Sequence, residues 1–299
     1  MTRSGILLLD KPQGPTSHDL VGMTRRALGT RRVGHAGTLD PMATGLMILG
    51  VESSTRLLTY LVGLDKEYTA TIRLGQATDT DDTEGSVVSS ADASALEEAA
   101  ITSAIAGLTG DILQVPSSFS AIKVDGVRSY DRARAGEEVA LVARPVRVSI
   151  FEVLASRHEG ALLDLDVRVA VSSGTYVRAL ARDLGAALGV GGHLTALRRT
   201  IVGPFSVADA VPPRAEVADA ELEARLLDPA DVARRLFPVV ELDAPEITAL
   251  AQGKRIPVAT ADAPVVATIG PDRRLRGLVS VDNGIARVLF NFPTAEVLP

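Results

Sequence analysis

A short loop in the first part of the chain holds the carboxylate best placed to act on a ligand. The stretch Gly34–Gly45 has three glycines in twelve residues, a spacing that favours a loop over a helix. Within it, Asp40 precedes Pro41, which biases the backbone toward an extended form and the carboxylate outward. The apolar run Leu46–Val51 follows directly. An ordinary Asp-Pro turn has the same spacing, so the residues alone leave a structural turn and a reactive carboxylate both open.

A second candidate is an arginine that follows a turn rich in serine and glycine. The stretch Val171–Arg178 runs from the end of an alternating strand pattern into a helical pattern, with Gly174 at the turn. An arginine delivered into a cleft there can pair with a carboxylate through a bidentate contact. A surface arginine on the first turn of a helix is the other interpretation.

The tyrosines are informative because the chain has only six phenylalanines, four tyrosines and no tryptophan. Tyr68 lies on the apolar face of an alternating run. Such a ring either packs in the core with a hydrogen-bonded hydroxyl or stacks on a nucleic-acid base.

Composition and missing motifs exclude several kinds of chemistry. The chain has no cysteine, which removes disulfides, thiolate metal sites and thiol catalysis. Its four histidines are scattered without an HxxH pair, so no structural zinc site is expected. The GxGxxG, P-loop and GxSxG fingerprints are also missing, which weakens dinucleotide-binding, nucleotide-hydrolysing and serine-esterase interpretations.

Hydropathy argues against a membrane protein. The longest stretch without a charged residue, Leu184–Leu197, is shorter than the roughly 20 apolar residues of a spanning helix. The apolar run Ile6–Leu9 is too short for a signal peptide. We therefore expect a cytoplasmic protein.

The distribution of charge matters more than its total. The net charge is −6, but the acidic segments 79–100 and 213–247 together carry more negative charge than the whole chain, so the remainder is net basic. That remainder includes the arginine pairs 25–26, 31–32 and 198–199. Local basic surface of this kind suits a phosphate backbone, although paired arginines also occur on solvated faces.

Apolar periodicity predicts the elements that must position these residues. Strands are expected at Ile6–Leu9, 67–74, 146–150 and 163–171. Helices are expected from Thr16 or Ser17 to about Leu28, from a capping box at Ser94–Glu97 to about Leu108, from about Thr175 to Leu188, and after the cap pair Asp228-Pro229. The acidic segment 77–85 is expected to be a surface loop. Strands with one polar face predict an α+β fold with a mixed, mainly antiparallel sheet flanked by helices.

The pattern changes at Val239. Beyond it come one short helix, expected at Pro245–Gln252, and several strands, with a hairpin signal at Asp282-Asn283-Gly284. We therefore predict two domains, 1–238 and 239–299, of which the second is small and rich in β-structure.

Several stretches, taken together, resemble the motifs of one family. They are Asp10–Ser17, Gly34–Gly45, Lys66–Tyr68, Ser120–Gly136, Ser172–Gly185 and His193–Gly203. In this order and spacing they make about residues 5–205 similar to the bacterial TruB family of tRNA pseudouridine synthases. One departure is Ser117, where the family often has a second proline after the residue equivalent to Pro116. We expect this departure to have only a local effect on the loop.

The resemblance implies a fold and a reaction. The fold would be that of the pseudouridine synthases, with 1–238 as the catalytic domain and 239–299 as a small PUA-like RNA-binding domain. The reaction would be the isomerisation of uridine-55 in the T loop of tRNA. It breaks the N1–C1′ bond and reattaches the base through C5, so it needs no net redox, hydrolysis or energy input, and neither a cofactor nor a metal is implied. The expected partner is the T-stem loop of tRNA, and a monomer is expected.

The resemblance also assigns roles to six residues. Asp40 would be the catalytic nucleophile, because an aspartate is ionised at pH 7 and a nearby Arg178 would keep it so. Tyr68 would pack on a flipped-out base. The remaining substrate-binding residues would be Tyr176 and Leu197, which line the pocket, and His35, which holds the extruded nucleotide or fills its place in the loop.

Alternatives from other classes remain. A pseudouridine synthase acting on ribosomal RNA is one, although the GHxGTLDP form of the loop argues against it. A non-catalytic RNA-binding or tRNA-folding protein on the same scaffold is another, but it would not require Asp40. A metal-dependent hydrolase lacks a cluster of ligands.

Overall fold

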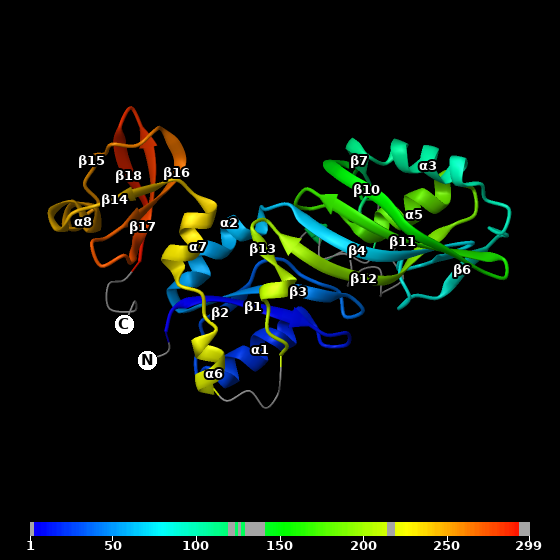
Figure 1. Ribbon diagram of the computed structural model, residues 1–299, viewed down its shortest axis with the longest axis horizontal. Coiled ribbons are helices and arrows are strands. Elements are labelled where there is room, and N and C mark those ends of the chain that lie inside the picture. The colour runs from blue at the N-terminus through cyan, green and yellow to red at the C-terminus, as the bar shows by residue number, and fades with distance from the viewer. Residues whose placement is uncertain (1–2, 119–122, 125–126, 129–140, 214–218, 293–299) are drawn as a thin grey trace. The chain divides into compact units, whose positions relative to one another are not determined.

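The computed structural model describes residues 3–118, 123–124, 127–128, 141–213 and 219–292. The chain divides into two compact units that alternate along the sequence (Figure 1). The first unit comprises Met1–Leu39, Met47–Val62 and Val207–Pro299, and the second comprises Asp40–Leu46 and Gly63–Ser206. These units are interleaved along the sequence, whereas the sequence analysis predicts a single boundary at 238/239. That boundary stays a prediction.

The second unit is built on a mixed, mainly antiparallel sheet with the strand order β3-β12-β4-β11-β10-β7. Its strands are β4 (Lys66–Leu74), β7 (Gly110–Gln114), β10 (Arg144–Glu159), β11 (Leu162–Val171), β12 (Gly192–Val202) and the start of β3 (Thr44–Val51), with β13 (Phe205–Ser206) paired to β12. Among the described strand pairs of this order, β12 and β3 run parallel and the others run antiparallel. Burial alternates strictly along β4, because one face of that strand covers the core.

Helices α3 (Glu98–Gly107) and α5 (Val177–Ala187) accompany this sheet, with α5 packed against β12 and β4 (Figure 1). A sharp return links α5 to β12. A Cβ atom on Gly185 would lie 2.2 Å from the backbone of Gly191, so only glycine permits this approach of helix and strand. Two small two-stranded sheets complete the unit: β5 (Gln76–Thr78) with β6 (Val87–Ser90), and β8 (Lys123–Val124) with β9 (Val127–Arg128).

The first unit begins with β1, which precedes a well-capped helix. Its elements up to the C-terminal sheet are β1 (Gly5–Lys11), α1 (Ser17–Ala27), β2 (Val33–His35), the rest of β3, the 3-10 helix η1 (Glu52–Leu57), α2 (Leu58–Val62), η2 (Val207–Asp209), α6 (Asp219–Ala224) and α7 (Pro229–Leu236). Thr16 caps α1 in a capping box with Asp19, and Asp228 caps α7. Both predicted helix starts are confirmed.

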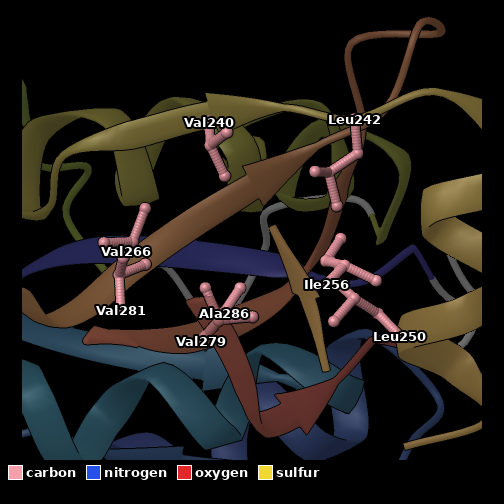
Figure 2. Close-up of a cluster of buried hydrophobic side chains, with 8 residues drawn as sticks. All are labelled: Val240, Leu242, Leu250, Ile256, Val266, Val279, Val281 and Ala286. Atoms are coloured by element: carbon pink, nitrogen blue, oxygen red, sulfur yellow. The ribbon is translucent and has the colours of Figure 1, made fainter. Parts of the chain in front are cut away.

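The last part of the first unit is built on a five-stranded sheet in the order β14-β16-β17-β18-β15. It contains β14 (Val239–Glu241), α8 (Ala244–Ala251), β15 (Ile256–Pro257), β16 (Ala263–Ile269), β17 (Leu275–Asp282) and β18 (Ile285–Asn291). Figure 2 shows its apolar core, formed by Val240, Leu242, Leu250, Ile256, Val266, Val279, Val281 and Ala286. The predicted hairpin is confirmed: Asn283 and Gly284 both have positive φ, and both backbone N–H groups donate to Asp262.

Some predicted elements are wrong or incomplete. Helix α3 starts at Glu98 without a side-chain cap, because Ser94 lies in a preceding turn where its N–H donates to Asp92. Strand β12 was not predicted, because two bulges interrupt its alternation. Apart from β8 and β9, the family-like stretch Ser120–Gly136 lies outside the described residues.

Candidate active site

The structure brings Asp40 and Arg178 together. Nε of Arg178 lies 3.0 Å from Oδ2 of Asp40, across 138 residues of sequence. The Arg178 side chain is only 5% exposed, whereas that of Asp40 is 35% exposed. The predicted pairing of this arginine with a carboxylate is therefore found, the interpretation as a surface arginine is wrong, and the bidentate form of the contact stays a prediction. The carboxylate of Asp40 is left accessible to a ligand while its partner is almost buried.

Backbone contacts fix the loop that carries Asp40. The N–H of Ala43 donates to the carbonyl of Asp40 at 3.1 Å and closes the turn. Gly45 has φ +100°, and a Cβ atom there would lie 2.2 Å from the backbone oxygen of Arg199. The hydroxyl of Thr44 reaches the carbonyl of Leu197 at 3.5 Å. The loop is therefore attached directly to β12, and the glycine is required by that close approach.

Among the described residues, Thr80, Ser117 and Asp82 also contact the guanidinium of Arg178. Its Nη1 donates to the carbonyl of Thr80 at 2.8 Å and to Oγ of Ser117 at 3.2 Å. Its Nε also lies 3.5 Å from Oδ2 of Asp82, whose side chain is 3% exposed. The other oxygen of Asp82 accepts hydrogen bonds from Thr80 Oγ1 at 2.6 Å and from the N–H of Glu84 at 3.0 Å. One guanidinium thus faces two carboxylates, one buried and one accessible.

This arrangement corrects the prediction for the acidic segment 77–85. It is not a surface loop throughout, because Asp81 and Asp82 are both buried. Their charges are compensated by two arginines one turn apart on α5, since Arg182 Nη1 lies 3.5 Å from Asp81 Oδ2 while Arg178 faces Asp82. Burial raises the pKa of Asp81, and the charge of Arg182 opposes that shift. The signal that could have revealed the contact is the i, i+4 arginine pair opposite adjacent acids.

Tyr176 is the N-cap residue of α5, and its backbone is held on both sides. Its N–H donates to Oε1 of Gln114 at 2.9 Å, and Nε2 of Gln114 donates to its carbonyl at 3.1 Å. The guanidinium carbon of Arg144 lies 5.1 Å from the centre of the Tyr176 ring, and Nη2 of Arg144 donates to the carbonyl of Gly174 at 2.8 Å. Sequence reasoning missed Gln114 and Arg144, because nothing in their own segments distinguishes them.

Tyr68 and Leu197 lie on the same face of the sheet. In the antiparallel register of β4 and β12, Tyr68 is opposite Arg199 and Leu197 is opposite Ala70. Directly opposite residues share a face, as do residues two apart on one strand. Both side chains are nearly buried. This placement follows from the strand register alone. The stacking role of Tyr68 stays a prediction.

His35 differs from the other predicted site residues because it belongs to the first unit. It lies half-buried in β2, opposite Leu49 of β3. Its predicted role therefore stays a prediction. Across the described ranges, no group of three or more metal-ligating side chains is found. In those same ranges no helix is long and apolar enough to cross a membrane.

The comparisons with known proteins first define a class through the fold. A chain from a solved H/ACA RNP bound to a substrate RNA containing 2′-deoxyuridine aligns with 99% of this chain and 87% of its own length. The TM-score of this alignment is 0.72, at 25% sequence identity. The fold, with its helix-flanked mixed sheet and small β-rich region, is therefore that of the pseudouridine synthases.

The family follows from the sequence matches. The TruB family pseudouridylate synthase N-terminal domain matches residues 25–177, and the tRNA pseudouridylate synthase B C-terminal domain matches residues 178–239. Relatives from Leifsonia xyli subsp. xyli and from an Arthrobacter species, both described as tRNA pseudouridine synthase B, are each 54% identical over 99% of both chains. This chain belongs to the TruB family of pseudouridylate synthases, and the predicted resemblance is confirmed.

Proposed function

We propose that this protein isomerises uridine-55 in the T loop of tRNA to pseudouridine, with Asp40 as the nucleophile. The observation that carries the proposal is the accessible Asp40 carboxylate held 3.0 Å from the almost buried Arg178 in a chain of this family. The relatives named tRNA pseudouridine synthase B support tRNA as the substrate.

The chemistry of the reaction fits these residues. The N1–C1′ bond breaks, the base turns over, a C5–C1′ bond forms, and the proton lost from C5 is balanced by one gained at N1. Throughout, a nucleophile must hold the base or the sugar, and a carboxylate can do this by adding to C6 of the base or to C1′ of the ribose. The guanidinium of Arg178 stabilises the carboxylate before it attacks and orients it through a fixed planar donor set.

The remaining site residues would recognise an extruded nucleotide. A uridine in an RNA loop can leave its stack at modest cost, and an aromatic ring then replaces the lost stacking. We assign this role to Tyr68, with Tyr176 and Leu197 lining the pocket and His35 holding the extruded nucleotide or filling its place. The shared sheet face of Tyr68 and Leu197 supports this assignment.

The organisation proposed for the whole chain follows from the same function. Residues 1–238 form the catalytic domain, and 239–299 form a PUA-like domain that binds RNA. The separate five-stranded sheet and core within the second range support that division. We propose a monomer that works in the cytoplasm, because Asp40, Tyr68 and Arg178 all come from one chain and tRNA is the substrate.

The test is release of tritium from a T-loop RNA labelled at C5 of its uridines. The wild-type protein should release the label, and Asp40→Asn should lower the rate by at least roughly a thousandfold, because the amide keeps the shape but not the nucleophile. Binding of the RNA should survive. The matched control is Asp111→Asn, which alters a carboxylate that is 80% exposed and should leave the rate unchanged. If Asp40→Asn keeps more than a tenth of the wild-type rate, Asp40 is not the nucleophile.

A further inference from the structure

The last residue of β7 and the three residues that follow it support the start of α5. Gln114 holds the backbone of Tyr176 through two hydrogen bonds. The carbonyls of Val115 and Pro116 accept from Arg182, at 2.6 Å from Nη2 and 3.5 Å from Nη1. Every residue of the segment Gln114–Ser117 therefore contacts the cap or the first two turns of this helix, and the last of these contacts reaches Arg178 itself.

Ser117 makes that last contact with a fully buried side chain. Its Oγ accepts from Nη1 of Arg178 at 3.2 Å, and its own hydroxyl lies 3.4 Å from the carbonyl of Thr80 and also interacts with the carboxylate of Asp81. The side chain thus reaches beyond its own loop, and the local effect expected at this position stays a prediction. A proline here would offer no hydroxyl, so the departure from the family pattern adds a polar contact to the guanidinium.

The hydrogen bond from Arg178 to Ser117 influences which of two carboxylates the guanidinium faces. Nε of Arg178 lies between Asp40 at 3.0 Å and Asp82 at 3.5 Å, so a small rotation of the planar group would favour one over the other. Thr80 and Ser117 both accept from Nη1, and each of these hydrogen bonds opposes that rotation. Removing one acceptor leaves the plane less well defined.

We propose that Ser117 is a positioning residue, whose hydroxyl sets the orientation of the Arg178 guanidinium toward Asp40. The proposal rests on the proposed function, because it concerns the rate of that reaction. Ser117 acts through the arginine, so its loss should change the chemical step and leave RNA affinity unchanged.

The first experiment separates kcat from KM in the tritium-release assay. Ser117→Ala should lower kcat about tenfold and keep KM within twofold, because one hydrogen bond to a charged group is lost. Ser117→Thr keeps the hydroxyl and should restore most of the rate. The matched control is Ser149→Ala, which removes an exposed hydroxyl that donates to the carbonyl of Ala170 at 3.1 Å, and it should behave as wild type.

The second experiment is a double-mutant cycle with Arg178→Lys. If Ser117 acts through the guanidinium, adding Ser117→Ala to Arg178→Lys should change kcat by less than twofold. An unchanged tenfold loss in that background would overturn the proposal, as would a raised KM with normal kcat in the single variant. Should Ser117→Ala fail to fold, Ser117→Cys replaces it, with a smaller loss expected because a thiol is a weaker partner.

The outcomes also distinguish the two proposals. An inactive wild-type protein would defeat the proposed function. An active wild type beside a fully active Ser117→Ala would defeat only the role of Ser117.

Discussion

Two sets of ion pairs in the second unit have similar distances, and they differ most in how far the arginine is exposed. At the start of α5, Arg178 faces Asp40 at 3.0 Å with an arginine side chain that is 5% exposed. On the sheet, Arg73 contacts Asp164 and Glu159 at 2.8 Å, and Arg168 contacts Glu67 at 2.8 Å. The second set extends to Arg157 and Asp166, whose side chains are 53% and 35% exposed. Distance alone therefore does not reveal what an ion pair does.

The two sets also arise differently. The sheet set follows from strand register, because Arg73 is directly opposite Asp164 on the polar face of β4 and β11. The α5 set joins a loop, a turn and a helix that are far apart in sequence. Exposed pairs contribute little, because water screens both charges. Removing one partner of a buried pair leaves the other charge buried without compensation. Mutation of the α5 set should therefore lower the free energy of unfolding far more than mutation of the sheet set.

The largest expected effect is that of Arg178→Ala. It should lower the tritium-release rate at least a hundredfold while RNA affinity changes only a few-fold, because Asp40 loses its orienting partner. It should also lower the free energy of unfolding by about 3 kcal/mol, since Asp82 is left buried without that cation. Arg178→Lys should recover stability more than rate, because lysine lacks the planar donor set.

The measurements are urea unfolding, RNA binding and turnover of the same preparations. A loss of RNA affinity with normal turnover of bound RNA would mean that Arg178 contacts phosphate. The ion pair at the start of α5 would then have no catalytic role that distinguishes it from the pairs on the sheet.

The same contrast explains what the sequence could predict. The sheet set lies on strands that alternate with period two, so 67–74 and 163–171 were predicted from local pattern alone. Asp40 and Arg178 were found as candidates because a glycine-rich loop and a turn mark their segments.

Local pattern does not reveal the residues that support Asp40 and Arg178. Asp82, Gln114 and Ser117 lie in a loop and at a strand end, where no periodicity distinguishes a buried polar residue from a solvated one. Their role depends on α5 packing over them, which is a tertiary event. Local pattern misses the burial of Asp81 and Asp82 for the same reason, since the arginines of α5 offset the cost of removing these two carboxylates from water.

A smaller effect is expected from Lys66, a third kind of charge in this unit. It is nearly buried at the start of β4, where its Nζ donates to the carbonyl of Leu64. Burial lowers the pKa of Lys66 from 10.5 to about 8, with a further lowering by the like charge of Arg199 and an opposing effect of Asp65. Between about pH 8 and 10.5 the unfolded chain therefore binds more protons than the folded one, and the free energy of unfolding rises with pH.

Lys66→Met removes this titration. The variant should be more stable than wild type at pH 7 by about 2 kcal/mol, less than the whole shift would give because the hydrogen bond from Nζ to the carbonyl of Leu64 is lost as well. Its advantage should shrink as pH rises from 8 to 10 in urea-unfolding curves. The control Lys254→Met alters an exposed lysine and should give a constant difference from wild type. Parallel curves for Lys66→Met and wild type would show that burial of this ammonium has no energetic consequence.

The smallest effect is expected where the geometry is most regular. Arg157 makes two hydrogen bonds to the carboxylate of Asp166, one of them at 3.1 Å from Nη2, and this contact lowers the pKa of Asp166, with help from Thr71. Because the folded-state pKa of this carboxyl is depressed, the contribution of the pair is present above its ordinary value of 3.8 and is lost as the pH falls below it.

Both partners are exposed, so that contribution should be slight. Arg157→Ala should shift Tm at pH 7 by no more than about 2 °C, and the shift should shrink further in high salt and as the pH falls below 3.8. Turnover and RNA affinity should match wild type, because the pair supports neither the loop of Asp40 nor the start of α5. A larger shift in Tm that persists in high salt would mean that this ion pair on the sheet stabilises the fold as strongly as the buried pair at the start of α5. A loss of turnover at unchanged Tm would mean that this exposed pair contacts the RNA, and burial would then no longer separate the catalytic charges from the others.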